Sequence, residues 1–156
     1  MTGVDLPDEN ATATFAARLA ALARPGDVIA LKGELGAGKT SFARAFIHAR
    51  GGEEAVPSPT FTLVQIYELH GGAIWHFDLY RLRNGEEIWE LGVEDAFREG
   101  ISLIEWPERL DSLLPARHLL VSFEFGATPD ARRATLSGGA EWPARLAALA
   151  IEATDG

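Results

Sequence analysis

A glycine-rich stretch has the residue types and spacing of a phosphate-binding loop. Residues 33–40, GELGAGKT, match the pattern G-x-x-x-x-G-K-[ST] at every fixed position. In such a loop, glycines let successive backbone N–H groups point at phosphate oxygens, and the following helix presents its positive end to the same anion. Lys39 is predicted to reach the β- and γ-phosphates, and the Thr40 hydroxyl to bind magnesium. The stretch therefore predicts a bound nucleoside triphosphate.

Two acids are candidates for the rest of a hydrolytic site, which needs a carboxylate near the magnesium and a group that positions water. Apolar runs end at Asp78, in AIWHFD, and at Glu105, in ISLIE. Ligands of open α/β sheets collect beyond the carboxyl ends of the strands, so either acid is placed to lie beside the loop. The alternative for each is a strand-end carboxylate that caps the next turn.

The loop VPSPTFT, after the expected phosphate-loop helix, holds a third candidate. Nucleotide-switch proteins place at this point a threonine that senses the γ-phosphate, which makes Thr60 the candidate, with simple turn chemistry as the alternative. The chain has two asparagines, and neither begins an Asn-Lys-x-Asp guanine motif, which favours ATP over GTP. Glu9 and the arginines at 132 and 133 are candidates for flanking the base.

These groups must be positioned by helices and strands that the sequence also indicates. Helical spacing, capping residues and Pro or Gly stops predict helices over residues 10–24, 39–52, 84–92 and 140–153. Asn84 and Glu87 form a capping box. Short apolar runs predict strands over residues 27–33, 101–106, 118–126 and 132–138, and a hairpin within 56–82. A hairpin inside a β/α alternation predicts a single α/β domain, residues 1–156, with a mixed central sheet flanked by helices.

The bulk composition excludes several other classes of protein. With 47% hydrophobic and 24% charged residues the chain is typical of a soluble globular protein, and no apolar run approaches the roughly 20 residues of a membrane span. The net charge of −9 disfavours direct binding of nucleic acid, which is expected only through a partner. The absence of cysteine and of a secretory signal predicts a cytoplasmic protein. Its four histidines lack the spacing of zinc ligands.

Four motifs occur together in one order: the phosphate loop, SPTFTLV, HFDLYRL and LIEWPERL. In these motifs and their spacing the chain closely resembles the bacterial TsaE (YjeE) family, small ATPases required for making N6-threonylcarbamoyladenosine in tRNA. The resemblance runs from LPDENAT to LPARHLL and is weakest after about residue 125. The resemblance implies a P-loop fold with a mixed sheet. It also implies that the protein works with two partner proteins, TsaB and TsaD. In that family TsaD carries out the threonylcarbamoyl transfer, and the ATPase resets or licenses the complex. The ATPase is therefore expected to reach the tRNA only indirectly.

The same resemblance implies roles for individual residues. Magnesium is expected at Thr40 and Glu105, with Asp78 and Thr60 completing the hydrolytic site around Lys39. An acid near the N-terminus also approaches the nucleotide in that family, and Glu9 is the matching position. The residues implied to hold ATP are Glu9, Gly36, Ala37, Gly38, Lys39, Thr40, Ser41 and Arg132, the last from PDARR, where this chain departs from the family in local sequence.

Two other functions stay open. A small-molecule kinase shares the phosphate loop but usually needs an arginine-rich lid, and the arginines at 81, 83, 109, 132 and 133 are dispersed. If Asp78 and Glu105 only cap turns, the protein is instead expected to be a regulatory module that binds a nucleotide without hydrolysing it. Whichever function holds, we expect Lys39→Ala to lose nucleotide binding and keep the fold, because the Lys39 side chain is predicted to face solvent when the site is empty.

Overall fold

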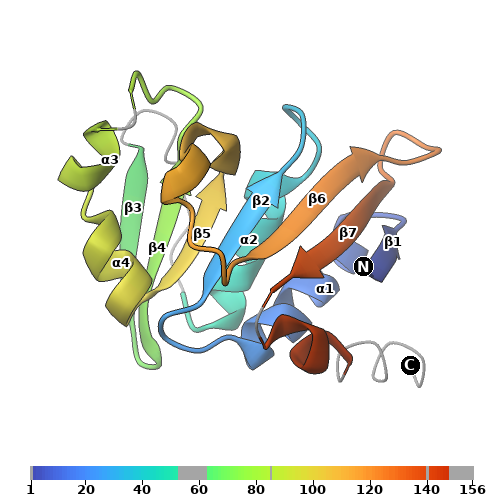
Figure 1. Ribbon diagram of the computed structural model, residues 1–156. Coiled ribbons are helices and arrows are strands. Elements are labelled where there is room, and N and C mark those ends of the chain that lie inside the picture. The colour runs from blue at the N-terminus through green and yellow to red at the C-terminus, as the bar shows by residue number, and fades with distance from the viewer. Residues whose placement is uncertain (1, 53–62, 85, 140, 148–156) are drawn as a thin grey trace.

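The centre of the molecule is a mixed sheet flanked by helices, as the sequence predicted, and this sheet has seven strands (Figure 1). The computed structural model describes residues 2–52, 63–84, 86–139 and 141–147. The strands are β1 (Thr2–Leu6), β2 (Val28–Lys32), β3 (Val64–Leu69), β4 (Gly72–Asp78), β5 (Ile101–Glu105), β6 (Leu119–Phe125) and β7 (Arg132–Gly138). Their order across the sheet is β1-β7-β6-β2-β5-β4-β3. The four inner strands β6, β2, β5 and β4 are parallel, and β3, β7 and β1 add antiparallel pairs at the two edges.

Helices cover both faces of the sheet (Figure 1). They are α1 (Glu9–Leu22), α2 (Lys39–Ala49), α3 (Glu87–Glu90) and α4 (Val93–Glu99), with short 3₁₀ turns η1 (Pro107–Arg109) and η2 (Asp111–Leu113). Helices α1 and α2 pack on one face, whereas α3, α4 and the turn after η1 enclose a second apolar cluster with β4 and β5. None of the helices in the described part of the chain combines the length and apolar character of a membrane span.

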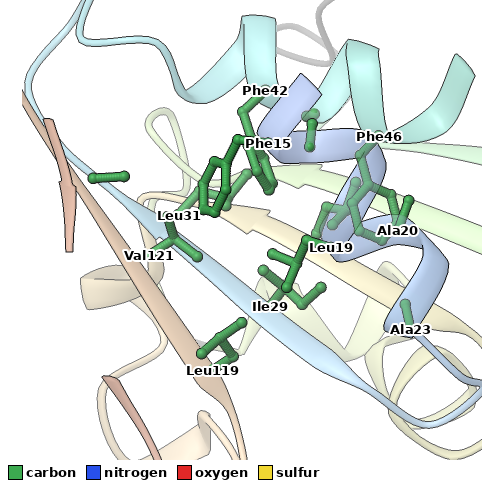
Figure 2. Close-up of a cluster of buried hydrophobic side chains, with 14 of the residues drawn as sticks. Phe15, Leu19, Ala20, Ala23, Ile29, Leu31, Phe42, Phe46, Leu119 and Val121 are labelled. Atoms are coloured by element: carbon green, nitrogen blue, oxygen red, sulfur yellow. The ribbon is translucent and has the colours of Figure 1, made fainter. Parts of the chain in front are cut away.

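The larger apolar cluster joins α1 and α2 to the sheet (Figure 2). Phe42 of α2 is fully buried, with its ring centroid 5.5 Å from that of Phe15 and 5.6 Å from that of Phe123. Ile29 and Leu31 of β2 face the same cluster. Strand β2 is covered on both sides, which explains why its sequence is a continuous apolar run instead of an alternating one. The packing of Phe42 fixes the first turn of α2, where the phosphate loop ends.

Strand register brings the predicted site residues to one edge of the sheet. Leu31 of β2 pairs with Glu105 of β5, and Glu105 pairs in turn with Asp78 of β4. The phosphate loop begins at Gly33, directly after β2. All three strands are parallel, so their carboxyl ends meet at this edge, where open α/β sheets bind their ligands.

Local structure agrees with the sequence at some elements and differs at others. The Asn84–Glu87 capping box is confirmed, since each side chain accepts the other residue's backbone N–H, at 3.2 and 3.1 Å. Helix α1 ends two residues earlier than predicted, because Ala23 is already extended ahead of Pro25. Strand β1 was not predicted: its five residues gain their strand partner from β7, far along the chain. Of the predicted closing helix, residues 142–147 are helical, and 148–153 lie outside the described residues.

Asp8 caps α1, the helix that carries Glu9, and its removal gives a local test of the fold. The Asp8 carboxylate accepts the Ala11 backbone N–H at 2.8 Å. We expect Asp8→Ala to lower the free energy of unfolding by about 1 kcal/mol, the usual effect of losing such a cap. Urea unfolding measures this change. Asn10→Ala, on the exposed side of the same helix, is the control, and an equal loss in both variants would contradict a capping role for Asp8.

Candidate functional site

The loop between β2 and α2 has glycines at positions where the backbone φ is positive, a conformation that favours glycine. Gly38 has φ 113° and is the N-cap of α2, whose first turn closes with Phe42 N–H donating to Gly38 O at 2.9 Å. Gly33 has φ 154°, and a Cβ there would lie 2.9 Å from the carbonyl oxygen of Phe123. The loop is therefore pressed against β6 and delivers the N-terminus of an 11-residue helix to the sheet edge, an arrangement suited to binding an anion.

The close approach of Gly33 to β6 predicts the effect of adding one methyl group. We expect Gly33→Ala to lower the free energy of unfolding by about 1–3 kcal/mol, through backbone strain and the contact with Phe123, and to weaken ATP-dependent stabilisation. Gly51→Ala is the matched control: Gly51 has φ 110°, but its added Cβ meets no atom within 4 Å. Thermal melts with and without ATP compare the two. An equal loss of ATP-dependent stabilisation in both would contradict the importance of the Gly33 contact.

A cavity beside this loop collects most of the residues that the sequence predicted. Those lining it are Glu9, Gly36, Gly38, Lys39, Thr40, Ser41, Glu105 and Arg132. Ala37 is different, because its side chain is buried in the main apolar cluster. Asp78 is close by but is not one of the lining residues, and Thr60 lies outside the described residues. Glu9 from α1, Glu105 from β5 and Arg132 from β7 thus meet around one loop.

Thr40 and Glu105 both line the cavity and contact each other directly. The Thr40 hydroxyl donates to Glu105 Oε1 at 2.8 Å, and the other carboxylate oxygen, Oε2, lies 2.7 Å from His76 Nε2. Glu105 is 2% exposed, so its charge is held in a desolvated setting by two side-chain partners. The carboxylate consequently has a fixed orientation toward the first turn of α2.

Thr40 and Glu105 fit the requirements of a magnesium ion. Mg²⁺ prefers oxygen ligands and is usually held by one or two carboxylates together with phosphates and water. The Thr40 hydroxyl and Glu105 carboxylate supply two such oxygen ligands at the loop. No group of three or more His, Cys, Asp or Glu side chains suited to a metal occurs within the described residues. These two oxygen ligands therefore suit a metal ion whose coordination is completed by a bound phosphate.

The position of Lys39 corrects one expectation from the sequence. Its side chain does not face solvent: Lys39 is 4% exposed, and its ammonium donates to the carbonyls of Gly33 and Glu34. The Nζ atom also lies 4.3 Å from the ring centroid of Trp106, a cation–π distance. Burial lowers the pKa of the Lys39 ammonium, and the carboxylates of Glu105 and Asp78 oppose that shift. The amine folds back over its own loop because these acceptors lie within its reach.

Asp78 is a buried acid with a clear structural role. It is 5% exposed at the end of β4, and its Oδ1 accepts the backbone N–H of Tyr80 at 3.1 Å. The turn-capping alternative raised from the sequence is therefore present for one carboxylate oxygen. Asp78 also pairs in register with Glu105 and acts on the charge of Lys39, which places it at the margin of the site.

Arg132 ties the far side of the cavity to the phosphate loop. Its guanidinium donates to Gly36 O at 3.0 Å and lies 4.8 Å from the ring centroid of Phe125. The neighbouring Arg133, a second candidate for the base, instead pairs with Asp5 of β1 and does not line the cavity. Alternate residues of a strand point to opposite faces, which separates these two arginines.

With this geometry in place, comparison with known proteins identifies the family. A family model described as "Threonylcarbamoyl adenosine biosynthesis protein TsaE" matches residues 6–134. The chain belongs to the TsaE family. The match spans the phosphate loop, both strand-end acids and Arg132, and it confirms the resemblance that the four motifs indicated.

Individual TsaE relatives and a solved structure agree with this result. The protein named tRNA threonylcarbamoyladenosine biosynthesis protein TsaE in Rickettsia bellii is 45% identical over 111 residues, which cover 70% of this chain and 77% of the relative. The Haemophilus influenzae protein of the same name is 37% identical over 126 residues, covering 77% and 80%. The crystal structure of Bacillus subtilis YdiB superposes with a TM-score of 0.82 at 28% identity, covering 97% of this chain and 95% of that one.

Several residues of this TsaE site were missed by sequence reasoning. Thr12, Leu35, Trp106 and Asp130 also line the cavity. Trp106 carries a usable sequence signal, since it follows Glu105 directly; in the structure its φ of 61° lies in the left-handed region. His76 is not among the predicted site residues, although it precedes Asp78 by two residues and so shares its face of β4.

Proposed function

We propose that this chain is a Mg²⁺-dependent ATPase that acts with TsaB and TsaD in forming N6-threonylcarbamoyladenosine in tRNA. The observation that carries the proposal is the 2.8 Å contact between Thr40, in the phosphate loop, and Glu105, at the end of the adjacent parallel strand. It joins the predicted phosphate loop to a buried carboxylate. Membership of the TsaE family supports the biosynthetic role.

In this proposal the loop binds ATP through its backbone and the first turn of α2. The side chains around the cavity cannot attract a triphosphate alone, because Lys39 and Arg132 are balanced by Glu9, Glu105 and Asp130. Backbone N–H groups at residues 36–41 therefore supply much of the attraction, and Lys39 turns from its own carbonyls to the phosphates. Glu9 and Arg132 flank the base. The cavity encloses about 190 Å³, so a nucleotide held here stays partly open to solvent.

Hydrolysis is assigned to residues of α2, β4 and β5 and to Thr60, which lies outside the described residues. Thr40 and Glu105 would hold Mg²⁺, which neutralises charge on the β- and γ-phosphates. Lys39 stabilises charge that develops as the terminal phosphate leaves. Asp78 and Thr60 are proposed to orient the attacking water. The water attacks the γ-phosphorus, the bond to the β–γ bridging oxygen breaks, and ADP and inorganic phosphate result.

The proposed partners agree with the charge of the chain. A net charge of −9 makes direct binding of the tRNA backbone unfavourable, so the tRNA is reached through TsaB and TsaD. ATP hydrolysis then acts on the state of that complex and not on the RNA itself.

Reconstitution tests the whole proposal. TsaB and TsaD are supplied with the threonylcarbamoyl donor and unmodified tRNA, with and without this protein, and modified adenosine is measured over many turnovers. We expect sustained formation only when the protein and ATP are both present. An equal yield without the protein would reject the biosynthetic role. Appearance of the γ-phosphate on a small molecule instead of in water would favour the kinase alternative.

A further inference from the structure

Strand β4 contributes a buried histidine that none of the roles above uses. His76 is fully buried, and its Nε2 lies 2.7 Å from Glu105 Oε2. An ionised carboxylate can only accept, so the hydrogen of this contact lies on Nε2. Glu105 is thereby held from both sides, since its other oxygen accepts the Thr40 hydroxyl.

Strand pairing makes this contact a property of the sheet. His76 and Asp78 lie two residues apart on β4 and share a face, and Asp78 pairs with Glu105 on β5. The imidazole reaches Glu105 along the diagonal between the two parallel strands. Both strands are buried interior strands, so neither ring nor carboxylate can move far without disturbing the core.

The second ring nitrogen argues against a role in packing alone. His76 Nδ1 is buried and has no hydrogen-bond partner among the described residues. An unsatisfied buried polar atom is unfavourable, and an apolar side chain of similar size would avoid it. The benefit of a histidine at this position must therefore come from its Nε2 contact.

We propose that His76 is a positioning residue that fixes the Glu105 carboxylate for binding the magnesium ion of Mg·ATP. This inference rests on the proposed function, because it assigns Glu105 to the metal. Hydrogen-bond partners of metal ligands orient those ligands, and their loss typically lowers metal affinity or activity by about 10–100-fold. The expected effect of removing the His76 donor is therefore on metal binding, with metal-free nucleotide affinity unchanged.

Three substitutions of His76 separate its hydrogen-bond donation to Glu105 from its packing in the core. His76→Leu removes the donor, His76→Gln keeps an amide N–H near the position of Nε2, and His76→Asn keeps an amide that is too short to reach Glu105. His118→Leu is the matched control, because His118 also makes one ring hydrogen bond, to Pro115 O, outside the cavity. Thermal melts establish which variants fold, and the Gln and Asn pair decides the question if the Leu variant does not.

The readout is the affinity for Mg²⁺ in the presence of a non-hydrolysable ATP analogue, measured by calorimetry. We expect the Mg²⁺ dissociation constant to rise about 10–100-fold in His76→Leu and His76→Asn, and to return most of the way in His76→Gln. A wild-type Mg²⁺ constant in folded His76→Leu or His76→Asn, or a Gln variant as weak as Asn, overturns the inference. Absence of ATP hydrolysis by the wild type would reject the proposed function instead. The Mg²⁺ titration would still show whether His76 contributes to metal binding.

Discussion

Lys39→Ala is expected to lower ATP hydrolysis by about 10²–10³-fold, the usual cost of removing a group that stabilises transition-state charge. The loss should include most nucleotide affinity, because Lys39 is one of only two cationic side chains that line the cavity in the described structure. Phosphate release measures the first effect, and the shift of the melting temperature by Mg·ATP measures the second.

The same substitution is expected to leave the fold intact, although Lys39 is buried. Alanine removes two hydrogen bonds to loop carbonyls, but it also removes a desolvated charge, whose burial already lowers the Lys39 pKa. These effects oppose each other, so we expect the free energy of unfolding to change by less than about 1.5 kcal/mol.

Lys32→Ala is the matched control, because Lys32 is the other lysine of the chain, lies exposed at the end of β2 and is outside the cavity. ATP-dependent stabilisation of Lys39→Ala equal to that of the wild type would contradict the proposed role of Lys39.

Glu105→Gln is expected to separate metal use from nucleotide binding. It keeps the shape of the side chain but removes the carboxylate charge proposed to bind magnesium, so hydrolysis should fall by at least about 10²-fold. Metal-free ATP should bind at least as tightly as to the wild type, because one of three acids around the cavity becomes neutral. Magnesium titrations of hydrolysis, together with nucleotide binding in EDTA, measure the two effects.

Glu108→Gln serves as control, since this exposed acid lies three residues further on in η1, outside the cavity. Undiminished hydrolysis by Glu105→Gln would instead favour a nucleotide-binding module in which Glu105 only orders the turn after β5.

The features that the sequence predicted correctly are those coded by neighbouring residues. The strand–loop–helix arrangement around residues 33–40 is marked by eight consecutive residues, and the Asn84–Glu87 capping box by four. The hairpin of β3 and β4 is marked by Gly71-Gly72 between two apolar runs. Each of these signals reports a local backbone geometry, which short stretches of sequence specify through their own steric and hydrogen-bonding preferences.

Some features that depend on contacts between distant parts of the chain were not predicted from the sequence. Strand β1 was missed because its apolar–polar alternation, at Val4, Asp5 and Leu6, is too short to predict a strand, and its strand partner β7 lies far along the chain. Helix α1 was predicted to run two residues too far, because Ala23 and Arg24 have helical propensity that the following turn overrides.

The sequence by itself determined the family, the strand–loop–helix segment that carries the phosphate-loop motif, and the two strand ends at which Asp78 and Glu105 lie. Tertiary structure alone decided how those groups meet: Thr40 and Glu105 are 65 residues apart and touch at 2.8 Å, and His76 holds the second oxygen of Glu105. It also turned the Lys39 amine onto its own loop and separated Arg132 from Arg133. The physical reason is that strand register and side-chain orientation follow from how the whole core packs, and no short segment of sequence contains that information.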